Sequence, residues 1–84
     1  MKNKINLLGM RDTKKFYEIV CGLKDANIFL SDGKGSKVNA KSWLGCVLAI
    51  SEWENIYIES DLDCYSAVEA FIEVAENDGN YIHQ

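Results

Sequence analysis

The stretch KVNAKSWLGCVLAI, from Lys37 to Ile50, decides the fold because it changes from a strand pattern to a helix pattern within a few residues. Residues 36–40 read as a strand, and residues 43–50 form an apolar run that is typical of a helix buried on several sides or partly offered to a partner. Ser42 stands at the junction, where its hydroxyl oxygen can accept a hydrogen bond from an unpaired backbone N–H of the first helical turn. We therefore expect a helix that begins at Ser42.

The segments on both sides of this stretch complete a small set of elements. DGKG at 32–35 predicts a hairpin turn, because glycine tolerates a positive φ. Apolar residues at helical spacing from Phe16 onward predict an earlier helix with Asp12 or Thr13 as its N-cap, and Asp63 is the expected cap of a last helix. In chain order we expect strand 4–8, helix 13–23, strands 27–31 and 36–40, the helix from 42, strand 55–60 and helix 64–77.

This order, β-α-β-β-α-β-α, predicts an α+β protein. With so few strands, the economical arrangement is one four-stranded, mostly antiparallel sheet with the three helices on one face, an open-faced sandwich. A chain of 84 residues buries only one modest core, so we expect a single domain over residues 1–84. The other face of the sheet would then be exposed to solvent.

The composition argues against several classes of function. Thirteen acidic and nine scattered basic residues give a net charge of −4, so we expect no direct nucleic-acid partner. The apolar runs are too short for a membrane span, which needs about 18 residues, or for a signal peptide, so we expect a cytoplasmic protein without a membrane partner.

The sequence also lacks the motifs that accompany a cofactor or a metal. Cys21, Cys46 and Cys64 are widely spaced and form no C-x-x-C, so buried free thiols are the expected state. No Gly-rich phosphate loop, metal-spaced His/Cys set or nucleophile–base pair occurs. We therefore expect no cofactor, no metal and no catalytic activity.

The segment VNAKSWLG, from Val38 to Gly45, resembles a motif of HPr, the small phosphocarrier of the bacterial sugar phosphotransferase system. Members of the HPr family carry VNAKS followed by an apolar pair and a glycine at the start of their second helix. NIFLSDGKGSK before the motif is similar to the hairpin of the family, and DCYSAVEAFIEV after it is similar to the last helix. The resemblance covers nearly the whole chain and implies the HPr-like fold.

The resemblance fails where HPr carries its phosphoryl group. The family has G-L-H-A-R-P at the start of the first helix, and the alignment places Gly9 at the position of the phospho-acceptor histidine and Arg11 at that of the phosphate-facing arginine. Imidazole accepts phosphate near neutral pH through its unprotonated nitrogen, and glycine has no such group. Asp12 is better explained as a helix cap than as an acyl-phosphate acceptor, and His83, the one histidine, lies in the polar tail. We expect no catalytic residue and no phosphate relay.

The resemblance gives Ser42 a second role beside that of a helix cap. In family members of Gram-positive-type bacteria, an ATP-dependent HPr kinase phosphorylates the serine at this position, and the product acts as a corepressor with a transcriptional regulator. Crh-type paralogues keep this serine and lack the histidine, as this chain does. The helix N-terminus and the neighbouring Lys41 would face the added phosphate. As a plain cap, serine is worth about 1 kcal/mol relative to alanine, so both roles stay open.

Trp43, Leu44 and Val47 follow the serine, and the resemblance implies that they form an exposed patch that docks an HPr kinase or a transcriptional regulator. The alternative is that Trp43 folds back onto the core. Three functions follow from these observations: a regulatory or adaptor protein gated at Ser42, a phosphocarrier with an unusual acceptor, and an HPr-fold interaction module unrelated to sugar transport.

Overall fold

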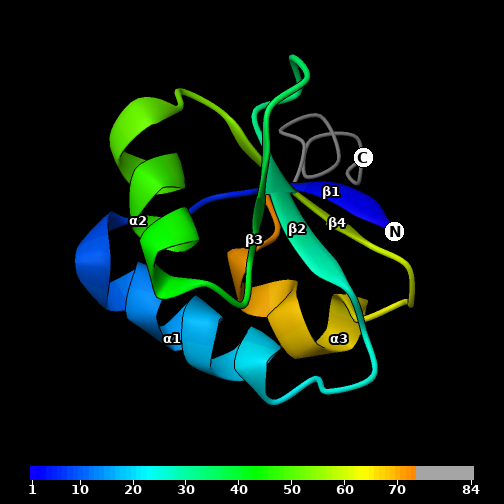
Figure 1. Ribbon diagram of the computed structural model, residues 1–84. Helices are drawn as coiled ribbons and strands as arrows, with labels where there is room; N and C mark the ends of the chain where they lie inside the picture. Colours follow the sequence, from blue (N-terminus) through cyan, green and yellow to red (C-terminus); the bar gives the residue numbers. More distant parts are fainter. Residues whose placement is uncertain (74–84) are drawn as a thin grey trace, which may run out of the picture.

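The computed structural model describes residues 1–73. Strands and helices alternate along this part of the chain, and a short 3-10 helix, η1, follows the last α-helix (Figure 1). In chain order the elements are β1 (Lys2–Ile5), α1 (Gly9–Cys21), β2 (Ile28–Ser31), β3 (Lys37–Asn39), α2 (Trp43–Glu52), β4 (Ile56–Ser60), α3 (Tyr65–Val68) and η1 (Glu69–Phe71).

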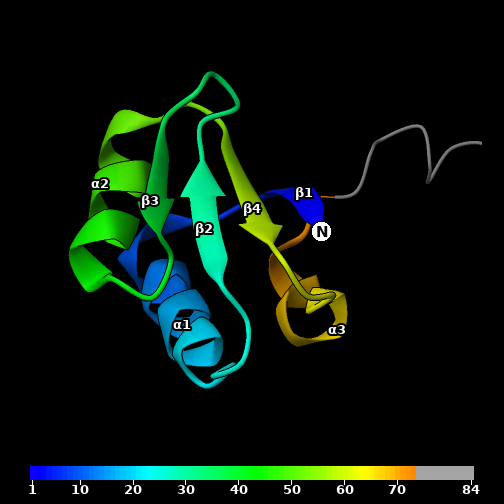
Figure 2. The same cartoon turned by 45° about the vertical axis from the view of Figure 1, so that its right-hand side comes forward.

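The strands form one antiparallel sheet in the order β1-β4-β2-β3. The two central strands, β4 and β2, pair over residues 57–60 and 28–31, and the hairpin β2–β3 adds one edge. Helix α2 packs against β3 and β2, and α1 packs against both other helices. Figure 2 shows α2 next to β3, with α1 and α3 in the lower part of the view.

Alternation along the strands assigns one face of the sheet to the core. In β2, Ile28 and Leu30 are buried, whereas Phe29 between them is 40% exposed. Ile58 of β4 lies on the buried face, where α1 contributes Phe16 and other apolar side chains. The helices therefore cover one face of the sheet and leave the other face to solvent.

The predicted α+β class is confirmed, with a four-stranded antiparallel sheet and three helices that are compatible with an open-faced sandwich. The predicted hairpin is also present, with slightly shorter strands. Gly33 in its turn has a φ of +77°, and a Cβ built there would lie 2.8 Å from the ring of Tyr57. Both the backbone conformation and the space thus require glycine at this position.

The first strand and the first helix begin earlier than predicted. Strand β1 ends at Ile5, because its register is set by pairing with β4. Helix α1 starts at Gly9, and the predicted caps lie inside its first turns. The Asp12 carboxylate accepts the N–H of Leu8 at 3.1 Å, and the Thr13 hydroxyl donates to the carbonyl of Gly9 at 2.8 Å. The prediction of a helix that starts at residue 13 was therefore wrong.

The last helix is much shorter than predicted within the described residues. Cys64, and not the predicted Asp63, is the N-cap of α3, although the Asp63 carboxylate accepts the N–H of Tyr65 at 3.0 Å. The helix ends at Val68 and gives way to η1. The chain then pairs with β1: Asn6 donates to the carbonyl of Phe71 at 2.8 Å, and the N–H of Glu73 donates to β1 at 2.9 Å. Sheet pairing replaces the helical bonds here, and residues 74–77 of the predicted helix lie outside the described residues.

Candidate functional site

Residues 39–42 form a tight turn that leads into α2. The side-chain Oδ1 of Asn39 accepts the N–H of Lys41 at 2.8 Å, and its carbonyl accepts the N–H of Ser42 at 3.0 Å. Ser42 has an extended backbone, and its Oγ accepts the N–H of Gly45 at 3.2 Å. The prediction that Ser42 caps this helix is confirmed. The Ser42 side chain remains half-exposed at the N-terminal end of α2.

Lys41 contacts a different part of the chain from the one predicted. Its Nζ donates to the carbonyl oxygens of Leu23 and Ala26, each at 2.7 Å. These carbonyls belong to the connection between α1 and β2, where unpaired C=O groups at a helix end attract cations. Two of the three N–H donors of this ammonium group are thus engaged with the backbone of that connection, whereas the sequence predicts that Lys41 faces a phosphate on Ser42.

The rest of the segment is fixed by close packing. Ala40 is fully buried, its N–H donates to the carbonyl of Ile28 at 2.9 Å, and its own carbonyl accepts the thiol of Cys46 at 3.2 Å. A Cβ at Gly45 would approach the carbonyl oxygen of Asn39 to 2.9 Å. Every residue discussed in this segment thus has a structural role, so the fold by itself accounts for a motif that the resemblance links to phosphorylation.

The predicted interface residues differ in how much of each reaches the surface. Leu44 is 79% exposed, whereas Val47 is half-buried. Trp43 packs against the core, and its ring makes an edge contact with Tyr17 at a centroid distance of 5.3 Å. Trp43 therefore contributes mainly to packing, as in the alternative that the sequence left open, and Leu44 is the prominent exposed member of the three.

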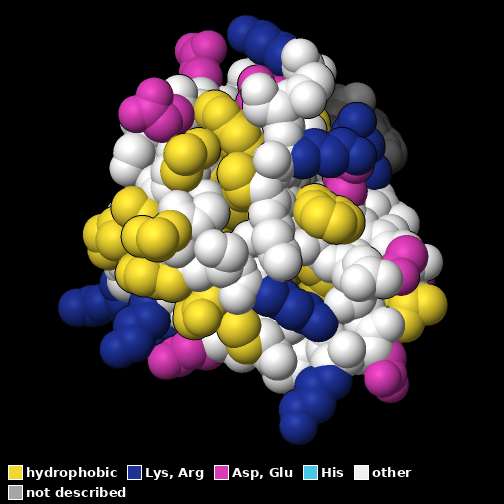
Figure 3. All heavy atoms as spheres, in the orientation of Figure 1, with side chains coloured by type: hydrophobic (Ala, Val, Ile, Leu, Met, Phe, Trp, Pro, Cys, Tyr) yellow, Lys and Arg dark blue, Asp and Glu magenta, His cyan; other side chains and the backbone are white. Residues whose placement is uncertain are grey.

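Further exposed apolar side chains extend this surface beyond the three predicted residues. Leu48 lies one turn after Leu44 and is 45% exposed, while Leu8 and Met10 at the start of α1 are 74% and 50% exposed. Figure 3 shows apolar side chains gathered over α2 and the beginning of α1. We call Leu8, Met10, Leu44, Val47 and Leu48 the apolar patch. The i, i+4 spacing of the two leucines was the sequence signal for this extension.

The start of α1 has the geometry of a free helix end. Gly9 is exposed with a φ of +84°, and a Cβ placed there would meet no atom within 4 Å. Arg11 is exposed in the first turn, and no salt bridge of residues 1–73 includes it. The space at the position predicted for the phospho-acceptor is therefore open, but it holds no nucleophile. His83 lies outside the described residues.

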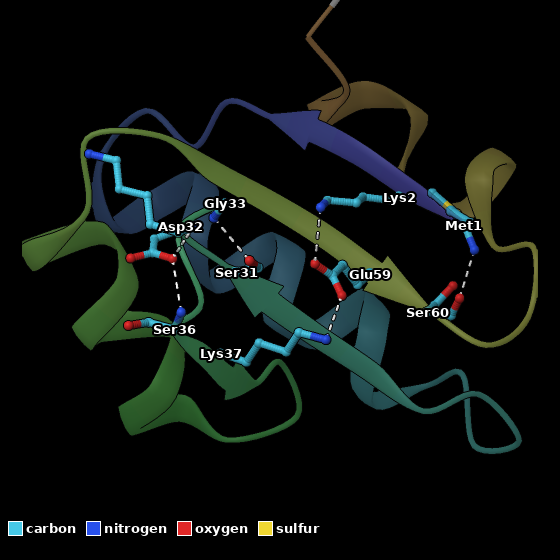
Figure 4. Close-up of polar contacts among 10 residues, drawn as sticks. Met1, Lys2, Ser31, Asp32, Gly33, Ser36, Lys37, Glu59 and Ser60 are labelled. Carbon is cyan, nitrogen blue, oxygen red and sulfur yellow. Dashed lines mark hydrogen bonds and ion pairs between the residues drawn. The ribbon is translucent and has the colours of Figure 1, made fainter.

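The open face of the sheet carries a network centred on a carboxylate. Glu59 of β4 lies between Lys37, at 2.8 Å, and Lys2, at 3.6 Å (Figure 4). The hydrogen bond from Lys37 lowers the pKa of Glu59. At the hairpin turn, Asp32 accepts the N–H groups of Lys34 and Ser36, and the first of these bonds lowers the pKa of its carboxyl group. These contacts stabilise the strands and leave no unpaired group with catalytic chemistry in the network.

The thiols are free and unequally buried. Cys46 and Cys64 are buried as predicted, whereas Cys21 is half-buried. Burial, together with the neighbouring Cys21, raises the pKa of the Cys46 thiol to about 11. Among residues 1–73, no three His, Cys, Asp or Glu side chains are grouped to hold a metal ion.

Comparison with known proteins gives no match: no protein-family model fits the sequence, and no similar curated protein or solved structure is found. The likeness to HPr therefore stays a prediction based on the motif from Val38 to Gly45 and on the order of elements. Within the described part of the chain, none of the helices has the length and hydropathy that crossing a bilayer requires.

Proposed function

We propose that this chain is a regulatory or adaptor protein of HPr type that acts in the cytoplasm by binding other proteins through the apolar patch. The observation that carries the proposal is the position of Ser42. Its side chain is half-exposed and directly precedes the first turn of α2, which contains Leu44. Leu44 is 79% exposed, and Leu48, one turn later on α2, is 45% exposed. Clustered exposed apolar side chains commonly mark a protein interface.

Phosphorylation of Ser42 is the proposed control of this interface. The first turn of α2 has unpaired backbone N–H groups, and a helix N-terminus favours a nearby anion by about 0.3–1 kcal/mol. A phosphoserine adds a charge of about −1.5 to −2 at neutral pH. This charge would lie at the border of an apolar surface, so it would change which partners bind without a change of fold.

The start of α1 supports a regulatory function over phosphate transfer. Gly9 provides no acceptor atom, and Asp12 is engaged with the backbone N–H of Leu8. The proposed partners are accordingly an HPr kinase and a transcriptional regulator, without direct contact to nucleic acid or membrane. We propose no catalytic activity and no cofactor.

The first experiment treats the purified protein with HPr kinase and labelled ATP. We expect one phosphate per chain in the wild type and in Ser51→Ala, since Ser51 is an exposed serine of the same helix. We expect none in Ser42→Ala. An unlabelled wild type, in a reaction that labels authentic HPr, would remove the phosphorylation from the proposal.

The second experiment measures the affinity for the kinase and for the regulator by calorimetry. Leu44→Ser should weaken binding by about tenfold or more, as for the removal of an anchor at the centre of an interface. Leu62→Ser is the matched control, because Leu62 is 50% exposed in the connection between β4 and α3. Equal affinities of the two variants would show that the apolar patch does not bind these partners.

A third experiment separates the proposal from a phosphocarrier with an unusual acceptor. The protein is incubated with phosphoenolpyruvate and the general enzyme of the phosphotransferase system, with authentic HPr as the positive control. We expect no phosphorylated form, because imidazole accepts phosphate as a labile P–N bond near neutral pH and Gly9 stands where the family has its histidine. An acid-labile phosphate on this chain would favour the phosphocarrier.

A further inference from the structure

The ammonium group of Lys41 occupies a site built from the backbone. Its two hydrogen bonds, to the carbonyl oxygens of Leu23 and Ala26, are both 2.7 Å long and partly buried. Three other lysines instead pair with carboxylates, two with Glu59 of the sheet and one with Glu73. Lys41 thus joins the turn before α2 to a segment that precedes it by 15 to 18 residues.

The connection between α1 and β2 is held in place by two side chains, of which Lys41 is one. The last turn of α1 contains no basic residue of its own, so Lys41 supplies the positive charge at that helix end. On the other side, Asp61 accepts the backbone N–H of Asn27 at 2.9 Å and its side-chain amide at 2.7 Å. The connection between α1 and β2 is therefore held between the turn that contains Lys41 and the turn that follows β4.

A phosphate on Ser42 would compete weakly for this ammonium group. If Lys41 left its present site, it would lose both short hydrogen bonds, and two backbone carbonyl oxygens would each lose a donor. Such a loss is costly for partly buried groups. The return would be one ion pair at a half-exposed position, where solvent and salt screen the attraction. The Ser42 oxygen already faces the backbone N–H of Gly45, so a phosphate there has a backbone partner without Lys41.

We propose that Lys41 acts on Ser42 by position and not by charge: it anchors the turn before α2 to the α1–β2 connection and keeps both carbonyl bonds when Ser42 carries a phosphate. This inference rests on the proposed phosphorylation of Ser42. Its consequence is that the charge of the phosphate is not neutralised by its nearest lysine. A partner that recognises the phosphorylated form must therefore contribute its own arginine or lysine side chains.

The test installs the phosphate chemically, so that it does not depend on any kinase. The bond between Gly45 and Cys46 is a suitable junction for native chemical ligation, which joins a phosphoserine-containing segment 1–45 to segment 46–84. The second pKa of the phosphate, normally about 6, is then followed by ³¹P NMR in the wild type, in Lys41→Met and in the control Lys14→Met. Lys14 is exposed in α1 and forms no salt bridge within residues 1–73.

We expect the same phosphate pKa in all three proteins. A contacting ammonium group would lower the phosphate pKa in the wild type, so a value about 1 unit higher in Lys41→Met than in Lys14→Met would overturn the proposal. Amide exchange gives the second outcome: Ala26 and Asn27 should exchange about tenfold faster in Lys41→Met, and unchanged exchange there would refute the anchoring role.

A measurement without any substitution covers the case in which Lys41→Met does not fold. In the ligated wild type, scalar couplings across the bonds from Lys41 Nζ to Leu23 and Ala26 should persist after phosphorylation, and their loss would overturn the proposal. Failure of the kinase to label Ser42 would count against the proposed function alone, because the ligated protein already carries the phosphate.

Discussion

Replacement of Gly45 by alanine should destabilise the protein, although alanine is the better helix former. Gly45 lies in the first turn of α2, where the helix passes close to β3. A Cβ at this position would lie 2.9 Å from the carbonyl oxygen of Asn39 and 3.2 Å from the Cβ of Val38. The first distance is too short for real atoms, and the carbonyl cannot move without disturbing the turn before Ser42.

The net effect follows from two opposing terms. Alanine gains up to about 1 kcal/mol of helix propensity over glycine, while overpacking against the backbone costs about 2–3 kcal/mol. We expect a loss of about 1–2 kcal/mol in the free energy of unfolding. Gly22→Ala is the control: its φ is −79°, and the nearest atom to the added Cβ is the Ile19 carbonyl oxygen at an ordinary 3.4 Å. That variant should be stabilised by about 0.5–1 kcal/mol.

Urea denaturation followed by tryptophan fluorescence measures both variants against the wild type. With a slope of about 1 kcal/mol per molar urea for a small domain, Gly45→Ala should lower the midpoint by about 1–2 M and Gly22→Ala should raise it. A Gly45→Ala protein as stable as the wild type would refute the close approach of α2 to β3.

Three further results are expected. Ser42→Ala should lower the free energy of unfolding by about 1 kcal/mol in urea denaturation, because the helix loses its cap, and a loss below about 0.3 kcal/mol would contradict the capping bond. In the native state at pH 8, iodoacetamide should modify Cys21 before Cys46, since burial raises the pKa of the Cys46 thiol to about 11; mass spectrometry of early time points should show the reverse order if the burial is wrong. Pairing with Lys37 lowers the pKa of Glu59 in the folded protein. This pairing therefore stabilises the fold fully above the pKa of an unfolded glutamate, about 4.3, and the stabilisation is lost as the pH falls through the lower folded pKa. Glu59→Gln should therefore reduce the loss of thermal stability in this acid range, and an unchanged pH profile would exclude the linkage.

The functional assignment depends on local geometry at one end of α2. There, the Ser42 hydroxyl caps the helix beside the exposed Leu44, and it is the group whose phosphorylation we propose. The same contacts also stabilise the fold, so stability measurements on Ser42→Ala do not test regulation. The kinase and binding assays do so directly, because they compare each variant with a control substitution of the same residue type elsewhere on the surface.

Features fixed by short-range interactions could be predicted from the sequence. The start of α2 follows from a serine whose oxygen reaches the N–H three residues later, and the hairpin follows from the glycines of its turn. Ile28 and Leu30 are buried and Phe29 between them is 40% exposed, because successive side chains of a strand point to opposite faces. In each case the decisive contact lies within a few residues, so the pattern of the chain is sufficient.

Other features were decided by contacts between distant parts of the chain. The end of α3 is set by pairing of residues 71–73 with the first strand and the residue after it, and this pairing replaces the helical hydrogen bonds expected for a helix over residues 64–77. Trp43 is half-buried because Tyr17 of α1 lies beside it, and Lys41 points to carbonyls 15 and 18 residues earlier in the chain. Periodicity and capping rules describe neighbours along the sequence. The acceptors of a lysine ammonium group and the partner of a strand edge come from distant parts of the sequence. They are determined only when the whole core is packed.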